Sequence, residues 1–467
     1  MPIPNPTIPK RRSRLNNEMK LFLALFLIAT LGGAIRKWFT SSSALSNIIL
    51  GVQMIIPFLI LYWRSPSAIS PFRRFGFLTV YFAYLAFHIV YPLQLTVFHG
   101  IFGMLVHGGF WLGMFYYFAN RQLFDPGKLA KLFIAIALLE LFLAFTQYAL
   151  PPDHILNKYA REGQTIAVVG DRVRVTGTFS YLSGYTAYLL FYPLMLWALV
   201  RLRFPQWLVL TGVAMGFAAS TMTGSRSGTL VYILLTGAML LREYPVSSLF
   251  AVAGRLLLPA LILTAVLLLY REIPLLDTVE KAYDNFMQRV ESNRRSGEQT
   301  ARILGDFYYL QTNRYQHPLL GVGLGSTYQG AVILFGVSRY VLEFGYVESE
   351  LSRVLLEGGW IMLILKFALS IYMAVNLSFK GFMRWAVWFV VAYGQPIVFN
   401  PHNAAFLLMG IILVDNIVWR QQLRLHVAGW QELATGLTAL HPRAKQRYKQ
   451  QPTKPAGGTP EVQEAQP

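Results

Sequence analysis

Arginines set among small polar residues are the part of the sequence most suggestive of chemistry. Arg174 lies in the stretch Arg174-Val-Thr-Gly-Thr-Phe-Ser, and Arg226 lies in Thr223-Gly-Ser-Arg-Ser-Gly. A guanidinium group keeps its charge, and its planar donors match the oxygens of a phosphate. Glycine, serine and threonine let a ligand approach the backbone. We therefore predict that Arg174 and Arg226 bind an anionic group. Structural ion pairs or contacts with lipid headgroups are the alternative.

Three further residues are candidates for the same site. Arg302 lies in a long polar stretch and adds a third arginine, and Glu348 follows that stretch at the start of a predicted helix. A carboxylate in this position can act as a general base. It can also be an ordinary acidic residue that the helix dipole favours. His402 follows Asn400-Pro401 at a predicted turn and is the last substrate-binding candidate.

Other ionisable residues have structural interpretations. Glu350, Arg353 and Glu357 are spaced three and four residues apart, so they share one face of a helix, and we expect them to pair with one another. We interpret three histidines in apolar segments without acidic neighbours as core residues instead of a proton relay: His88, His99 and His107.

Several motifs that would indicate other chemistry are missing. The sequence has no Asp-x-Asp pair, no Walker A loop and no His-Glu-x-x-His, and the run Gly321-Val-Gly-Leu-Gly325 does not have dinucleotide-binding spacing. Glu348-Ser-Glu350 alone is a poor metal site. The chain has no cysteine, which excludes disulfides, thiolate metal ligands and cysteine nucleophiles. The sequence therefore predicts a site without a metal or another cofactor.

The elements that position these residues are apolar. Of the 467 residues, 55% are hydrophobic and 13% are charged, whereas a soluble protein carries about 25% charged residues. Apolar runs long enough to cross a bilayer recur along the chain. The formal net charge is +19, but the basic residues mostly lie in short stretches between apolar runs. That pattern is typical of membrane topology signals and argues against nucleic-acid binding.

The sequence predicts an all-α, polytopic integral membrane protein with about twelve transmembrane helices. The apolar segments lie near residues 21–35, 44–63, 75–92, 95–119, 129–150, 181–200, 206–223, 227–241, 256–270, 350–378, 385–400 and 402–419. With the N-terminus in the cytoplasm, the cytoplasmic flanks hold 24 Lys and Arg residues. The opposite flanks hold 7, leaving out their one long loop. The positive-inside rule therefore predicts two cytoplasmic termini.

This topology divides the chain into five parts. They are a basic cytoplasmic N-terminus (1–20), helices one to nine (21–270), a long extracytoplasmic loop (271–346), helices ten to twelve (347–420) and a cytoplasmic tail (421–467). The first apolar run has no clear cleavage site, so we expect a retained helix. The polar stretch 278–311 predicts a small helical cap. The tail after about residue 450 has a composition typical of disorder.

Four stretches in this order resemble the O-antigen ligase and O-antigen polymerase superfamily of membrane glycosyltransferases. They are the two arginine stretches, the run from His317 to Gly325, and the helix start from Glu348 to Gly359. The resemblance covers roughly residues 20 to 420 and implies a fold like that of the C-type glycosyltransferases. It also implies a bacterial inner-membrane enzyme that needs neither nucleotide sugar nor metal.

The resemblance implies transfer of a glycan from undecaprenyl pyrophosphate to an acceptor hydroxyl, with inversion at the anomeric carbon. Arg174, Arg226 and Arg302 match the pyrophosphate-binding arginines of the family. The ligases have a histidine where this chain has Glu348, which favours the polymerase branch, with Glu348 as the base. Expected partners are the lipid-linked glycan donor, a glycan acceptor, membrane lipids, a chain-length regulator and a flippase.

Three other functions stay open from the sequence. A ligase that moves a finished glycan to a lipid or protein differs from a polymerase only in its acceptor. A membrane transporter or flippase would favour inverted repeats and charges at the middle of the membrane. We see no repeat, and the candidate charges cluster at one face instead. A structural scaffold would give no reason for arginines in glycine-serine turns.

Overall fold

The computed structural model describes residues 16–40, 42–63, 71–160, 167–169, 172–244, 318–344, 349–394, 397 and 400–440, with the single positions 284, 287 and 291. Contacts divide the chain into one unit up to Val418 and another from Trp419. Everything below concerns the first unit. The predicted helix at 256–270, most of the loop 271–346 with its cap, and the tail after 450 lie outside the described residues.

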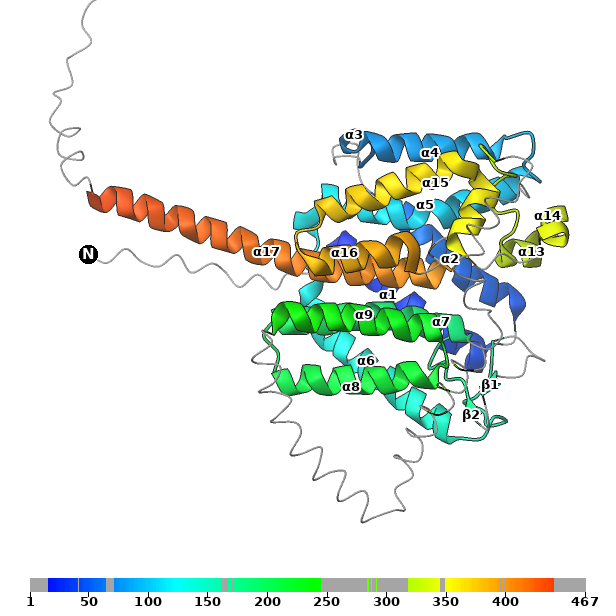
Figure 1. The fold of residues 1–467 in the computed structure, drawn as a ribbon, viewed down its shortest axis with the longest axis horizontal. Coiled ribbons are helices and arrows are strands. Elements are labelled where there is room, and N and C mark those ends of the chain that lie inside the picture. The colour runs from blue at the N-terminus through cyan, green and yellow to red at the C-terminus, as the bar shows by residue number, and fades with distance from the viewer. Residues whose placement is uncertain are drawn as a thin grey trace, which may run out of the picture. The chain divides into compact units, whose positions relative to one another are not determined.

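The described residues form helices and one short hairpin (Figure 1). The first helices are α1 (Asn17–Ala34), the π-helical turn η1 (Ile35–Phe39), α2 (Ser43–Trp63), α3 (Pro71–Arg74), α4 (Gly76–Ile89), α5 (Val97–Ala119) and α6 (Ala130–Ala149). The hairpin pairs β1 (Val168–Val169) with β2 (Arg172–Val173). There follow α7 (Leu182–Arg201), α8 (Gln206–Met222), α9 (Arg226–Glu243), α13 (Gln329–Phe335), α14 (Arg339–Phe344), α15 (Glu350–Asn376), α16 (Phe382–Phe389), η4 (Val390–Gly394) and α17 (Pro401–Leu440).

These helices confirm the all-α membrane class. Within the described residues, six helical stretches are long and apolar enough to cross a membrane: Asn17–Phe39, Val97–Ala119, Arg121–Ala149, Leu182–Arg201, Glu350–Asn376 and Pro401–His426. Shorter apolar helices cover Ala44–Leu59, Gly76–Ile89, Gln206–Met222 and Phe382–Gly394. Large apolar side chains such as Phe77, Phe142 and Ile364 are exposed. A bilayer would cover them.

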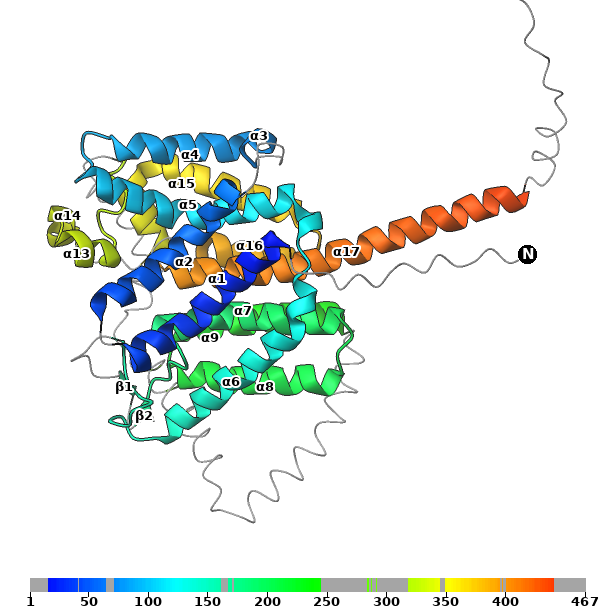
Figure 2. The ribbon, with the colours of Figure 1, turned by 180° about the vertical axis from the view of Figure 1, so that it is seen from behind.

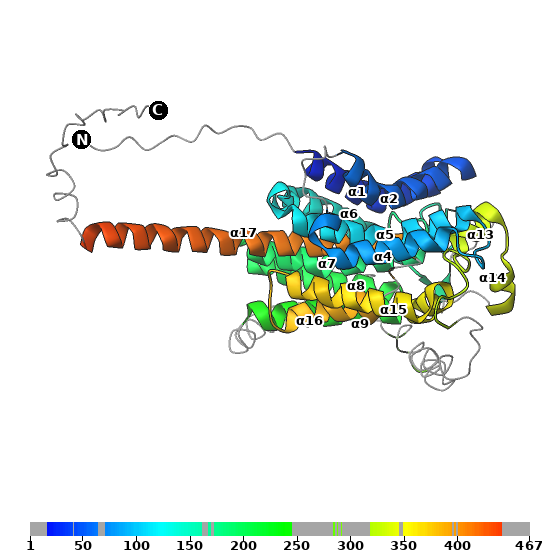
Figure 3. The same cartoon turned by 90° about the horizontal axis from the view of Figure 1, so that it is seen from above.

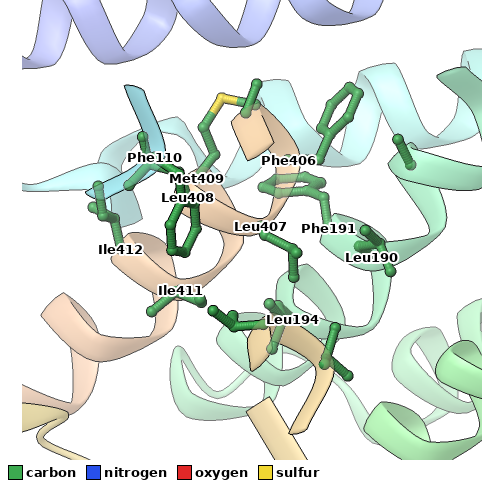
Figure 4. Close-up of a cluster of buried hydrophobic side chains, with 14 of the residues drawn as sticks. Phe110, Leu190, Phe191, Leu194, Phe406, Leu407, Leu408, Met409, Ile411 and Ile412 are labelled. Atoms are coloured by element: carbon green, nitrogen blue, oxygen red, sulfur yellow. The ribbon is translucent and has the colours of Figure 1, made fainter. Parts of the chain in front are cut away.

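The start of α17 is buried against α5 and α7. Phe406, Leu407 and Met409 of α17 are buried with Phe191 of α7, and Phe110 of α5 belongs to the same core (Figure 4). Helix α7 also packs on α8 and α9, and α4 packs on α5 and α15. Figure 2, the view from behind, and Figure 3 show α1 and α2 lying across one side of these helices.

The candidate residues that the structure describes, Arg174, Arg226 and His402, lie where several helices begin. In Figure 1 the starts of α7, α9, α15 and α17 lie at the same end as the hairpin, α13 and α14. We call this the site end. Ion pairs fix the other end: Arg121 lies 3.3 Å from Asp415, and Arg201 lies 2.5 Å from Glu243. The long helices thus connect the site end to an opposite end that is fixed by ion pairs.

Candidate functional site

The two arginine stretches meet at the site end. The Nε of Arg174 donates to the carbonyl oxygen of Thr223 over 2.8 Å, and the backbone N–H of Val175 donates to the carbonyl of Met222 over 3.3 Å. Arg174 is therefore tied to the turn that leads to Arg226. Both arginines are partly buried. Two segments about fifty residues apart thus place Arg174 and Arg226 at one turn.

The turn from Thr223 to Arg226 begins helix α9. Gly224 has a φ of 58°, in the left-handed region that favours glycine. The side chain of Ser225 caps the helix by accepting from the N–H of Gly228 over 3.4 Å. Arg226 is the first residue of α9, where the positive end of the helix dipole adds to its own charge. An anion at this turn would meet a favourable field.

Helix α6 holds the middle of the segment from Arg174 to Ser180. The Oε1 of Gln147 accepts from the N–H groups of Thr176 and Gly177 over 3.0 and 2.8 Å. The carboxylate of Glu140 accepts from the N–H of Thr178 over 3.1 Å and from its hydroxyl. Gly177 has a φ of 53°, and a Cβ there would lie 2.2 Å from Oε2 of Glu140. The segment needs a glycine at this position.

Two cations of the π-helical turn η1 bind the same segment, and the sequence interpretation gave them no role in the site. Lys37 donates through Nζ to the hydroxyl of Thr176 over 2.8 Å and to the carbonyl of Gly177 over 2.9 Å. Arg36 donates to the hydroxyl of Ser180 over 2.9 Å. Both side chains are buried, with 8% exposed. Their position at the end of an apolar run could have suggested this role from the sequence. A cation there must contact either lipid headgroups or hydrogen-bond acceptors of the protein.

His402 lies next to this second group of cations. It is the second residue of α17 and is partly buried. Its Nδ1 lies 3.3 Å from Nε2 of Gln53 in α2, and its ring meets that of Phe179 edge-on at 6.4 Å between centroids. Arg36 is near enough to interact with it electrostatically. The structure thus places His402 beside Arg36, at the other end of the segment from Arg174.

A buried carboxylate organises the glycine-rich run before α13. Oε2 of Glu357 accepts from Nε2 of His107 over 3.0 Å and from the N–H of Gly325 over 2.8 Å. Its Oε1 accepts from the N–H and the hydroxyl of Thr327 over 3.1 and 2.6 Å. The backbone of α15 breaks at Gly359, whose φ is 64°. This run is therefore a packed loop, in which the N–H groups of Gly325 and Thr327 bind the carboxylate of Glu357.

The three residues expected to pair on one face of α15, Glu350, Arg353 and Glu357, also have partners elsewhere. Glu350 pairs with Lys366 over 2.6 Å, and Arg353 donates to the carbonyl of Thr327 over 2.9 Å. Glu357 binds His107, Gly325 and Thr327, so the carboxylates of Glu350 and Glu357 both bind residues outside this set of three. The guanidinium carbon of Arg353 lies 5.6 Å from the ring centre of Tyr328. Burial raises the pKa of the Tyr328 hydroxyl, and the nearby Arg353 opposes that shift.

Two histidines of the apolar segments, His88 and His99, have the partners expected of core residues. The ring nitrogens of His88 lie 3.1 and 2.8 Å from the carbonyls of Tyr84 and Leu320. Nδ1 of His99 lies 2.9 Å from the hydroxyl of Thr96. His107 differs, because its partner is the carboxylate described above.

Two of the predicted site residues, Glu348 and Arg302, lie outside the described residues. The structure therefore brings together Arg174 and Arg226 at one place and His402 with Arg36 at another. Within the part of the chain that the structure describes, no group of three or more His, Asp or Glu side chains could hold a metal ion.

Comparisons with family models, with curated proteins and with solved structures found no match to this chain.

Proposed function

We propose that this protein polymerises oligosaccharide repeat units that are linked to undecaprenyl pyrophosphate, for an exopolysaccharide or O-antigen. The contact between Arg174 and the carbonyl of Thr223, beside Arg226, carries the proposal. It ties the guanidinium of Arg174 to the turn from which Arg226 begins α9, at one end of an all-α membrane protein. Such a pair suits an anion with several oxygens, and a pyrophosphate attached to a membrane lipid has that chemistry.

In the proposed reaction an acceptor hydroxyl attacks the anomeric carbon of the donor sugar. The bond from that carbon to the pyrophosphate oxygen breaks, its electron pair leaves with the lipid pyrophosphate, and the configuration inverts. Arg174 and Arg226, with Arg302, stabilise the charge that develops on the leaving group. Glu348 takes the proton of the hydroxyl. The step requires no oxidant or reductant.

The proposal includes a topology. Twelve helices cross the inner membrane of a bacterium, both termini are cytoplasmic, and the loop 271–346 forms a cap on the outer side. Reporter fusions at Gly297 and Gly458 test it. We expect an extracytoplasmic signal from the first fusion and a cytoplasmic signal from the second. A cytoplasmic signal from Gly297 would move the proposed site to the wrong side of the membrane.

The function is tested by polymer formation from lipid-linked repeat units in membranes that contain each variant at equal amounts. Arg174→Ala and Arg226→Ala should each lower the rate by about 10²- to 10³-fold, the loss expected for one stabilising donor group. Lysine at either position should rescue poorly, because its point charge cannot bind two oxygens in one plane. Arg172→Ala is the control: this neighbouring side chain donates to the carbonyls of Tyr148 and Ala149.

Three results would contradict the proposal. Nearly full activity of both lysine variants would remove the bidentate role of the arginines. Transfer of one finished glycan to a different lipid, with no polymer formed, would favour the ligase. Release of the lipid on the other side of the membrane without any transfer would favour the flippase.

A further inference from the structure

The end of the first helix lies directly against the segment from Arg174 to Ser180. A Cβ added at Gly33 of α1 would lie 2.5 Å from both the backbone nitrogen of Ser180 and the carbonyl oxygen of Thr178. The hydroxyl of Thr178 also donates to the carbonyl of Thr30 over 2.7 Å. Backbone packs on backbone here, so a shift of this helix end would move the segment.

Lys37 lies in the turn η1 that ends this helix. This turn is a π-helical stretch of five residues, and π-helical turns are rare and often lie at functional sites. Nζ of Lys37 donates to the hydroxyl of Thr176 over 2.8 Å and to the carbonyl of Gly177 over 2.9 Å. All three residues are buried, so water does not compete for these hydrogen bonds.

Helix α6 holds the same two residues through Gln147. Its Oε1 accepts from the N–H groups of Thr176 and Gly177, whereas Lys37 binds the hydroxyl of the first residue and the carbonyl of the second. The carbonyl of Gly177 also accepts from Nε2 of Gln147 over 3.0 Å. This backbone group therefore keeps a partner when Lys37 is replaced, and the change loosens the segment without leaving a buried carbonyl unpaired.

The position of Arg174 depends on that of Thr176. The two residues are two steps apart in the chain, so their Cα atoms are separated by at most about 7 Å. Val175 between them is buried and bonds through its N–H to the carbonyl of Met222. A movement of Thr176 is thus passed directly to Arg174. Displacing a group that stabilises the transition state by about 1 Å can cost about 10²-fold in rate.

We propose that Lys37 is a positioning residue of the site. Its two hydrogen bonds hold the segment so that the guanidinium of Arg174 stays at the turn before α9. Lys37 acts through Thr176 and Arg174 and does not touch the substrate. The inference rests on the proposed function and goes beyond it, because it gives the first helix of the chain a part in the reaction.

Polymer formation with equal amounts of each variant in the membrane tests the inference. Lys37→Met removes the donor and keeps an apolar side chain of similar length, so the rate should fall by about ten- to a hundredfold. Thr176→Val removes the accepting hydroxyl, keeps the shape of the side chain and should give a similar fall. Thr176→Ser keeps the hydroxyl and should have a rate close to that of wild type.

The same changes in an Arg174→Ala background separate positioning from support of the fold. Without the guanidinium of Arg174 there is nothing to position, so Lys37→Met should lower the residual rate very little. A purely structural defect would lower the rate by the same factor in both backgrounds. Lys128→Met is the matched control and should leave both rates unchanged, because Lys128 is half exposed and forms a surface ion pair with Asp125 over 3.0 Å.

The outcomes separate this inference from the proposed function. A wild type that forms no polymer would overturn both. Polymer formation by wild type, with equal losses from Lys37→Met in the two backgrounds, would overturn the inference and leave the proposed function standing, as would a wild-type rate for Lys37→Met. Should Lys37→Met be missing from the membrane, the two Thr176 variants decide the question, because equal rates for Thr176→Val and Thr176→Ser would overturn the inference.

Discussion

Removal of the Glu357 carboxylate should destabilise the protein more than any other single change at the site end. This side chain is 1% exposed and accepts four hydrogen bonds, from His107, Gly325 and twice from Thr327. Because a carboxylate only accepts hydrogen bonds, Nε2 of His107 carries its proton in this arrangement. Glu357 therefore joins α5 and the run before α13 to α15.

The size of the effect follows from how many donors each substitution leaves unpaired. In Glu357→Gln the amide oxygen can still serve Thr327, and His107 can change tautomer to accept from the new NH₂ group. The N–H of Gly325 then faces another donor. One buried unsatisfied donor costs about 1–3 kcal/mol. Glu357→Ala removes every acceptor and leaves His107 and Arg353 without this carboxylate, which costs about 3–5 kcal/mol.

The measurement is the free energy of unfolding in mixed micelles, with wild type and variants at the same detergent composition. Glu343→Gln makes the same chemical change on an exposed residue of α14 and should stay within about 0.5 kcal/mol of wild type. Combining Glu357→Ala with Thr327→Val should give less than the sum of the two losses, because each single change already breaks the bond that the two side chains share. Wild-type stability of Glu357→Ala would refute the role assigned to this carboxylate.

Three other predictions concern the segment, the base and the metal. Gly177→Ala should destabilise by more than about 1 kcal/mol, because φ is 53° and the new Cβ would meet Glu140; Gly237→Ala, in open space on α9, should not destabilise in the same unfolding assay. Glu348→Gln should slow polymer formation by about 10²-fold or more with donor binding kept, whereas Glu350→Gln should lower stability more than rate; a wild-type rate for the first would place the base elsewhere. Activity should survive EDTA, and loss that magnesium restores would contradict a metal-independent step.

The sequence predicted the helices closely because each apolar run is bounded by strong local signals. The run 206–223 corresponds to α8, Gln206–Met222, which follows Pro205 and ends before Gly224. The split near Pro92 is also real, since α4 ends at Ile89 and α5 begins at Val97. Such boundaries depend on a few neighbouring residues, so they can be read without knowledge of packing.

The partners of buried charges could not be predicted in this way. Glu357 and His107 are 250 residues apart, and their contact depends on how α5 packs on α15. The sequence predicted pairing among Glu350, Arg353 and Glu357, because their spacing places them on one face of a helix. A sequence gives no direct information on which residues of other helices lie nearby. Helix packing also gave both carboxylates partners outside this set, Lys366 and His107.

Arg36 and Lys37 illustrate a physical ambiguity that only tertiary structure resolves. A cation at the end of an apolar run can extend to lipid headgroups or turn inward, and the cost of burial decides against turning inward unless acceptors are present. Thr176, Gly177 and Ser180 supply those acceptors from a segment about 140 residues away. The segment from Arg174 to Ser180, which first suggested a site, thus also explains why Arg36 and Lys37 are buried against it. The candidate site therefore extends from α9 to η1, further than the arginine stretches alone indicated.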